Sequence, residues 1–267
     1  MTAQNRTQIS ELLARHGLVP IHRLGQHFLA DANITRKVVR LAGVAPGDQV
    51  LEVGAGTGTL TRALGEAGGR VLAFEIDRRL GPILEEATAG MTVETRLEDV
   101  TKIDLATTLG NGPWKMVSNL PYNVGTPLLL DTLRHVPQID RFVVMVQHEV
   151  AERLVAPPGG AAYGLPSVVV GIHAEGSIAM EVPPQVFVPP PKVSSAVVVL
   201  DRIVAPPSSE RAIELASAAF NQRRKMIRRS LRDAFEDVGE ALLAADLSPT
   251  ARAEDLSPSD YVRLAAV

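Results

Sequence analysis

The stretch Gln49-Val50-Leu51-Glu52-Val53-Gly54-Ala55-Gly56-Thr57-Gly58 joins a short apolar run to a glycine-rich loop. Turn residues at 46–48 precede the run, so residues 49–53 are predicted to form a buried strand. Residues 60–64 continue at helical spacing, and Gly68-Gly69 ends that helix. This order of strand, glycine loop and helix lets bare backbone approach a ligand at a helix N-terminus.

Other apolar runs repeat the strand-then-helix pattern along the chain. They lie at residues 70–74, 91–93, 114–118 and 142–146. This alternation predicts an α/β fold with βαβ units, a mostly parallel sheet and right-handed crossovers. Residues 177–182 and 194–202 indicate two more strands in a hairpin-like arrangement, so the seven-stranded sheet is expected to end mixed. Residues 167–170 fit either a strand or a buried helix.

The sequence changes character near residue 205. Pro206-Pro207-Ser208-Ser209 has the composition of a linker and a helix N-cap, and helical patterning continues from there to the C-terminus. We therefore predict an α/β domain at residues 1–204 and a small all-helical domain at residues 205–267.

Composition limits the kinds of partner. A formal net charge of −3 gives no global attraction to a polyanion, so any nucleic-acid surface must be a local basic patch. The lack of cysteine excludes disulfides, and the six histidines have no paired ligand spacing, so we expect no metal. Residues 1–17 lack the layout of a secretory signal, and no uncharged apolar run is long enough to span a bilayer. We expect a soluble cytoplasmic protein with no membrane partner.

Two acids at predicted strand tips indicate a nucleoside ligand beside the glycine loop. Glu75 follows Gly54 and Gly56 by about twenty residues, a spacing typical of an acid that binds ribose hydroxyls. Thr59 stands where a nicotinamide dinucleotide fingerprint has its third glycine, which favours S-adenosylmethionine as the cofactor. Asp99, at the third strand tip, is a candidate acceptor for the adenine amino group, and a helix cap or a solvated loop acid is its alternative.

Asn119-Leu120-Pro121-Tyr122 follows the predicted strand at 114–118, so it lies at the ligand-binding edge of the sheet. The side-chain carbonyl of Asn119 and the backbone carbonyl of Leu120 are two acceptors for the N–H bonds of a flat aromatic amine, and Tyr122 offers a stacking face. Both bonds favour a pyramidal nitrogen that attacks a sulfonium methyl group, with no general base needed before transfer. The alternative is an asparagine-containing turn with Tyr122 packed in the core.

Phe187 lies in a proline-stiffened loop and is the candidate for a second stacking face. A base taken out of its stack needs an aromatic face on each side, and Tyr122 with Phe187 would supply the two. The alternative for Phe187 is a core position under the hairpin.

A basic segment runs from Gln222 to Arg232. Its cations are Arg223, Arg224, Lys225, Arg228, Arg229 and Arg232. We predict one helix here, with Ile227, Leu231 and Phe235 facing inward and the cations outward. No acid is interleaved with the cations in an otherwise acidic protein, which favours phosphate contact over a merely solvated face.

Five stretches, taken together and in order, closely resemble the KsgA-type ribosomal RNA adenine dimethyltransferases. The similarity covers nearly the whole chain, and the stretches are Leu24-Gly25-Gln26-His27-Phe28-Leu29, Leu51-Glu52-Val53-Gly54-Ala55-Gly56-Thr57-Gly58, Asn119-Leu120-Pro121-Tyr122-Asn123, Phe187-Val188-Pro189-Pro190-Pro191-Lys192-Val193 and Phe220-Asn221-Gln222-Arg223-Arg224-Lys225. The glycine motif is common to methyltransferases, whereas the whole set is specific.

The resemblance implies a class I Rossmann-like methyltransferase domain at 1–204, with S-adenosylmethionine as donor, and a helical RNA-binding domain at 205–267. It implies dimethylation of two adjacent adenines near the 3′ end of small-subunit ribosomal RNA, in a 30S assembly particle, and we expect a monomer. By motif match the cofactor would be lined by His27, Leu29, Gly54, Gly56, Glu75, Asp99 and Asn119. The target base would be held by Asn119, Leu120, Tyr122 and Phe187, and RNA by Arg223, Arg224, Lys225 and Arg228.

Three positions depart from the family pattern. His27 stands where asparagine is usual, Gly125 replaces serine or alanine, and Pro166 lies where an Arg-Leu-Ser stretch is usual. The first puts a side-chain contact at residue 27 in doubt, and Pro166 is expected to reshape its turn. None removes an expected catalytic group.

Other functions stay open on sequence alone. A large-subunit ribosomal RNA adenine methyltransferase that confers antibiotic resistance would share the fold, but the Phe187 loop and residues 220–224 are closer to the small-subunit group. A non-catalytic RNA-binding assembly factor would share it too, and the intact Asn119 motif argues against that role. A nicotinamide-dependent oxidoreductase is disfavoured by Thr59.

Overall fold

The computed structural model describes residues 4–267, which fall into two compact units. The first runs to residue 151 and resumes at 176–201, and the second comprises 152–175 and 202–267. The second unit also takes in residues 152–175, which the sequence assigned to the first, because α8 (Leu165–His173) packs against the C-terminal helices α9 and α12.

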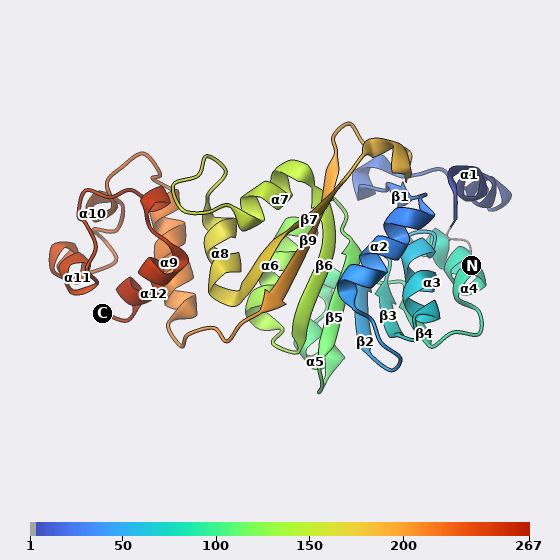
Figure 1. The fold of residues 1–267 in the computed structure, drawn as a ribbon, viewed down its shortest axis with the longest axis horizontal. Coiled ribbons are helices and arrows are strands. Elements are labelled where there is room, and N and C mark those ends of the chain that lie inside the picture. Colours follow the sequence, from blue (N-terminus) through green and yellow to red (C-terminus); the bar gives the residue numbers. More distant parts are fainter. Residues whose placement is uncertain (1–3) are drawn as a thin grey trace. The chain divides into compact units, whose positions relative to one another are not determined.

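Seven strands of the first unit form one sheet in the order β4-β3-β2-β5-β6-β9-β7 (Figure 1). The first five are parallel to their neighbours, and β9 runs antiparallel to β6. Their bounds are β2 Gln49–Val53, β3 Arg70–Phe74, β4 Val93–Arg96, β5 Trp114–Asn119, β6 Ile139–Gln147, β7 Ala174–Val182 and β9 Ser195–Arg202. The mostly parallel seven-stranded sheet with a mixed edge is therefore confirmed.

Two local assignments are settled by backbone bonding. Residues 167–170, which fit either element by sequence, belong to helix α8. The strand predicted at 91–93 begins only at Val93, because the Met91 amide closes a turn onto the Thr88 carbonyl.

The first unit also contains helices, most of which flank its sheet. They are α1 Arg6–Arg15, α2 Ala32–Ala42, α3 Thr59–Glu66, α4 Gly81–Thr88, α5 Leu105–Leu109 and α6 Gly125–His135, and α7 His148–Val155 follows β6. Helices α2 and α3 lie side by side, α2 against β5 and β6 and α3 against β3 (Figure 1). Asp31 caps α2 by accepting from two backbone amides, and Gly43 ends it in the left-handed conformation.

The core of this unit lies between α2, α3 and the sheet. Its fully buried members include Val50, Ala73, Val117 and Val143, one from each of four adjacent strands. Because helices cover the parallel strands, these read as near-continuous apolar runs rather than as alternating ones. A separate two-stranded sheet pairs β1 (Phe28–Leu29) with β8 (Phe187–Val188).

The second unit consists of helices packed around α9. Besides α8 they are α9 Ser209–Phe220, α10 Ile227–Ser230, α11 Val238–Ala244 and α12 Pro258–Ala265. Its centre is aromatic: Phe220 lies between Tyr163 and Tyr261, at centroid distances of 6.0 and 6.4 Å. Both tyrosines are buried and donate to backbone carbonyls, so their hydroxyls are satisfied. Pro166 occupies the first turn of α8, where the missing N–H costs no hydrogen bond.

No helix within residues 4–267 combines the length and the apolar character needed to cross a bilayer.

Candidate active site

A cavity of about 180 Å³ opens at the carboxyl ends of β2, β3, β4 and β5. Its walls come from five segments: residues 24–29, the glycine loop after β2, the tip of β3, residues 98–101 and residues 119–124. Every residue predicted to bind the cofactor lines this cavity. Ligands of open α/β sheets bind at this edge, so the cavity is the candidate active site.

The glycine loop forms the floor of the cavity because side chains would not fit there. Gly54 and Gly56 have φ angles of 81° and 58°, in the left-handed region. A Cβ atom on Gly56 would lie 2.9 Å from the Phe28 ring, and one on Gly54 would lie 3.2 Å from the Pro121 ring. The loop therefore presents bare backbone to the cavity.

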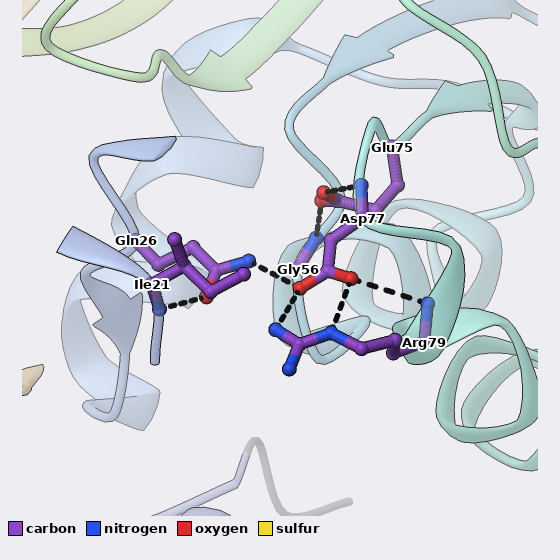
Figure 2. A network of polar contacts seen from close by, with 6 residues as sticks. All are labelled: Ile21, Gln26, Gly56, Glu75, Asp77 and Arg79. Atoms are coloured by element: carbon purple, nitrogen blue, oxygen red, sulfur yellow. Dashed lines mark hydrogen bonds and ion pairs between the residues drawn. The ribbon is translucent and has the colours of Figure 1, made fainter. Parts of the chain in front are cut away.

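Glu75, at the tip of β3, holds the loop in place. One carboxylate oxygen accepts from the Gly56 amide at 2.8 Å, and the other accepts from the Asp77 amide at 2.9 Å (Figure 2). Burial raises the pKa of this carboxyl, while the two backbone donors act in the opposite direction. Each oxygen retains a second acceptor position for a ligand hydroxyl.

Asp99 lies on another wall, and its carboxylate accepts hydrogen bonds from Thr101. One oxygen accepts from the Thr101 hydroxyl at 2.7 Å and from the Thr101 amide at 3.1 Å. These bonds lower the pKa of Asp99, so it is an anionic acceptor at neutral pH. The helix-cap role weighed from sequence and the position in the cavity are both present.

Asn119 ends β5 with its side-chain amide held in one orientation. Its Nδ2 donates to the His27 backbone carbonyl at 3.0 Å. Among the described residues no donor is assigned to Asn119 Oδ1 or to the Leu120 carbonyl, whereas the Leu120 amide donates to Met145. Two carbonyl acceptors thus stand at the end of this strand.

Tyr122 is half-buried and lines the cavity beside His27. Its hydroxyl and that of Ser195, on β9, lie 2.6 Å apart, and its ring lies 5.4 Å from the His27 imidazole at an interplanar angle of 30°. The His27 Nδ1 in turn lies 2.8 Å from the Pro189 carbonyl. The side chain of His27 therefore braces the tyrosine.

Gly125 begins α6 directly behind Leu120. A Cβ atom there would lie 2.8 Å from the Leu120 Cβ, so a larger residue would require Leu120 to shift. This departure from the family pattern changes packing behind the motif rather than a polar group.

The structure does not place Phe187 in the cavity, in contrast to its predicted role as a stacking face. The side chain is fully buried, in the same core cluster as Leu29 and Val143. Strand β8 pairs with β1 so that Phe187 lies opposite Leu29. An aromatic ring gains more from core burial than from a wall open to water, and the alternative core position is the one observed.

The predicted single basic helix is also corrected. Residues 221–225 form turns, Met226 is extended and bridges to Arg252, and only Ile227–Ser230 are helical. Ile227 and Leu231 are buried as expected, and Phe235 is half-buried. The bridge to Arg252 takes the backbone out of helical geometry at Met226, a long-range contact that periodicity does not report.

All six cations of the basic segment are exposed. Two of them lie beside acids: Arg232 beside Asp233, and Arg223 beside Glu254, at 2.5 Å. The guanidinium of Arg223 also contacts the Ala161 carbonyl. Four exposed cations without an assigned acidic partner therefore lie within residues 224–229.

Sequence reasoning missed Glu52, a wall residue inside strand β2. Its side chain is 1 % exposed, and one carboxyl oxygen has no hydrogen-bond partner among the described residues. Burial raises the pKa of Glu52 to about 8, with a further contribution from the nearby Glu75. The signal was an acid within a strand predicted to be buried.

The described residues contain no cluster of three or more acids or histidines that would hold a metal.

This fold and this cavity define a class I Rossmann-like methyltransferase. The model of one protein family, "Ribosomal RNA adenine dimethylase", matches residues 21–267. The chain belongs to that family.

Curated relatives match over almost the full length. A "Ribosomal RNA small subunit methyltransferase A" from Phenylobacterium zucineum is 46% identical over 99% of this chain and 94% of its own length. One of the same name from Leifsonia xyli is 44% identical over 97% of this chain and 96% of its own.

Two solved structures share the fold. The 23S rRNA methyltransferase ErmE is 26% identical, with a TM-score of 0.70 over 90% of this chain and 98% of its own. A dimethyladenosine transferase from Plasmodium falciparum is 24% identical, with a TM-score of 0.76 over 89% of this chain and 96% of its own.

The buried position of Phe187 gives a stability prediction. Phe187→Ala leaves a cavity in the core, so we expect it to lower the free energy of unfolding by about 3–5 kcal/mol, measured by urea denaturation. Val193→Ala, at an exposed site, is the control, with an expected change within about 0.5 kcal/mol. Wild-type stability combined with slow turnover would contradict the core assignment and restore the stacking role.

Glu52 gives a prediction about pH. Its folded-state pKa, about 8, exceeds the value of 4.5 expected in the unfolded chain, so between these values the folded state binds the extra proton. The free energy of unfolding contributed by this group therefore falls as pH rises, by up to about 1.4 kcal/mol per pH unit. We expect Glu52→Gln to lack this fall, so that its stability relative to wild type increases from pH 5 to pH 8 in urea titrations.

The exposed Glu85 supplies the matched control. Glu85→Gln is expected to follow the wild-type pH dependence. A constant stability difference between Glu52→Gln and wild type across this range would show that Glu52 is ionised in the folded protein.

Proposed function

We propose that this protein transfers methyl groups from S-adenosylmethionine to the N6 amines of two adjacent adenines near the 3′ end of small-subunit ribosomal RNA. Membership of the ribosomal RNA adenine dimethylase family and the names of its curated relatives support this substrate. The observation that carries the chemistry is the pair of acceptors, Asn119 Oδ1 and the Leu120 carbonyl, at the edge of the cavity.

The cavity suits an adenosine-containing sulfonium cofactor. Its floor is bare glycine backbone, where a Cβ on Gly56 would meet Phe28, and two acids, Glu75 and Asp99, offer acceptors to ribose hydroxyls and to an amino group. We assign Gly54, Gly56, Glu75 and Asp99 to the cofactor, with the backbone of His27 and Leu29 on the opposite wall. When bound, S-adenosylmethionine supplies an electrophilic methyl group.

The residues of this chain act on the other reactant, the adenine amine. In its resting form the amine lone pair is delocalised into the ring, which makes the nitrogen a poor nucleophile. Hydrogen bonds from its two N–H groups to Asn119 Oδ1 and to the Leu120 carbonyl favour a pyramidal nitrogen with a localised lone pair. Pro121 stiffens the turn that holds the two carbonyls together, so catalysis is mainly positioning and electrostatics.

Tyr122 gives the target base one aromatic face, and the ring of His27 supports that tyrosine from the side. With Phe187 in the core, the described structure offers no second aromatic face from that position. After transfer the amine carries an extra proton and is acidic, so water accepts the proton and no general base is required.

RNA affinity is assigned to the basic segment of the helical unit. Arg224, Lys225 and Arg228 are exposed, and phosphate contacts from such cations bind RNA without reading its sequence. We further propose that the substrate is a 30S assembly particle in the cytoplasm and that the protein acts as a monomer. The related function on large-subunit RNA, the role in the name of ErmE, is the alternative that the substrate test addresses.

The function is tested by labelled methyl transfer to purified 30S particles, followed by nucleoside analysis of the RNA. Wild type is expected to yield N6,N6-dimethyladenosine, and Asn119→Ala, which removes one amine acceptor, to lose at least about 100-fold in kcat. Asn111→Ala, at an exposed loop position, is the matched control and should act as wild type.

Two results would count against this function. Methylation of protein-free large-subunit RNA with none of 30S particles would favour the resistance-type enzyme. Full activity of Asn119→Ala would remove the amine-positioning mechanism.

The basic segment gives a prediction about salt. The triple change Arg224→Ala, Lys225→Ala and Arg228→Ala should weaken RNA binding and reduce the slope of log K against log salt by about 2–3, because three phosphate contacts and their released counterions are lost. Fluorescence titrations at several salt concentrations measure this slope.

Arg70→Ala, an exposed cation at the amino end of β3, is the control and should leave the slope unchanged. An unaltered slope in the triple variant would exclude the basic segment from the RNA interface.

A further inference from the structure

We propose that Asp77 and Gln26 form a clamp that positions the amide of Asn119, so that both are positioning residues for methyl transfer. This inference rests on the proposed function, because it concerns the same amine-binding carbonyl. The clamp joins two stretches far apart in sequence, the loop at residues 21–27 and the tip of β3 (Figure 2). Neither side chain is needed as an acceptor for the target amine.

Asp77 is the fixed half of the clamp. Its side chain is 5 % exposed and forms a two-point pair with the Arg79 guanidinium, at 2.8 Å from Nε and 2.7 Å from the terminal nitrogen. These bonds lower its pKa to about 2. Its backbone amide donates to Glu75, the residue that holds the glycine loop. The carboxylate is thus rigidly placed beside the cavity.

Gln26 connects the loop at residues 21–27 to Asp77. Its Nε2 donates to Oδ2 of Asp77 at 2.9 Å, and its Oε1 accepts from the Ile21 amide at 2.7 Å (Figure 2). Because the two ends of the amide have opposite roles, the side chain is fixed in one orientation. It closes the loop on itself and ties it to β3 at the same time.

The loop at residues 21–27, which Gln26 holds in place, lies directly against the turn at residues 121–123. Gly25, at a φ of 65°, packs so closely that a Cβ atom would lie 3.2 Å from the Tyr122 backbone nitrogen. The Asn123 side chain donates to the Arg23 carbonyl at 3.2 Å. A displacement of this loop would therefore also displace residues 121–123.

His27, the residue after Gln26, makes the hydrogen bond that orients the side-chain amide of Asn119. The His27 carbonyl accepts from Asn119 Nδ2, and this bond decides which end of the Asn119 amide faces the cavity. An amide that loses its partner is free to turn about its last side-chain bond, which would exchange the acceptor Oδ1 for a donor. Holding His27 in place thus preserves the acceptor for the target amine.

A local structural role accounts only for the contacts of Asp77 with Arg79. Asp77 also caps the short 3-10 helix Arg78–Leu80 by accepting from the Arg79 amide, and that role explains the pair with Arg79. It does not explain the bond to Gln26, which lies 51 residues away in sequence. The bond to Gln26 is the one that the proposal uses.

The test exchanges donor and acceptor across the clamp. Gln26→Glu sets a second carboxylate against Asp77, and we expect kcat for methylation of 30S particles to fall about tenfold or more, because misplacement of a reacting group is costly. The KM for RNA should change less than about twofold, since transition-state positioning is lost rather than uniform binding. The double variant Gln26→Glu with Asp77→Asn restores one donor and one acceptor between residues 26 and 77, but the side-chain nitrogen that Asp77→Asn introduces loses the bond from the Arg79 terminal nitrogen. We therefore expect kcat to recover at least about threefold over Gln26→Glu without reaching the wild-type value.

Arg78→Ala, on the same short helix with its side chain exposed, is the control and should retain wild-type turnover. Thermal unfolding of all variants shows whether each is folded, and the recovery of kcat in the double variant is the result that a merely structural role would not give. Wild-type kcat in Gln26→Glu, beside an inactive Asn119→Ala, would overturn the clamp alone. A folded double variant that stays as slow as Gln26→Glu would also overturn it, and full activity of Asn119→Ala would overturn the clamp together with the proposed function.

Discussion

The buried carboxylate of Glu75 is the interaction on which the architecture of the cavity depends. It accepts hydrogen bonds from the Gly56 amide on one side and from the Asp77 amide on the other. The first fixes the glycine loop at Gly56, which has no side chain to anchor it, and the second fixes the start of the Asp77–Gln26 connection. A carboxylate with two backbone donors in a poorly solvated site is strongly held, since charge-assisted hydrogen bonds gain strength as water is excluded.

Burial affects the pKa values of Glu75 and Glu52 differently, although both line the same cavity. Glu75 has two backbone donors, which oppose the effect of burial on its pKa, whereas Glu52 has an oxygen without a partner and a pKa raised to about 8. A neutral Glu52 behind a donor-satisfied Glu75 avoids two unpaired charges at the same wall. A neutral Glu52 therefore limits the repulsion between the acids of the cavity, and Asp99, whose pKa is lowered, is an anionic acceptor there.

Tyr122 and Phe187, the two aromatic residues expected to hold the target base, lie in different environments. Tyr122 has a hydroxyl that needs a polar partner, finds it in Ser195, and keeps its ring at the cavity wall. Phe187 has no polar group, and pairing of β8 with β1 carries it into the core. The two residues differ because tyrosine has a hydroxyl group that needs a hydrogen-bond partner, whereas both have an aromatic ring.

The sequence by itself determined the class of fold and the edge at which the cavity forms. Apolar runs of strand length, the glycine loop after 49–53 and the acid some twenty residues later are local patterns, and parallel strands bring their tips together whatever their partners. Hence Gly54, Glu75, Asp99 and Asn119 were all expected at one edge, and they line one cavity. Only tertiary structure decided the burial of Phe187, the bridge that breaks the basic segment at Met226 and the bond from Gln26 to Asp77. Each of these depends on contacts between residues distant in the chain, whose free energy outweighs local preference and leaves no periodic signal in the sequence.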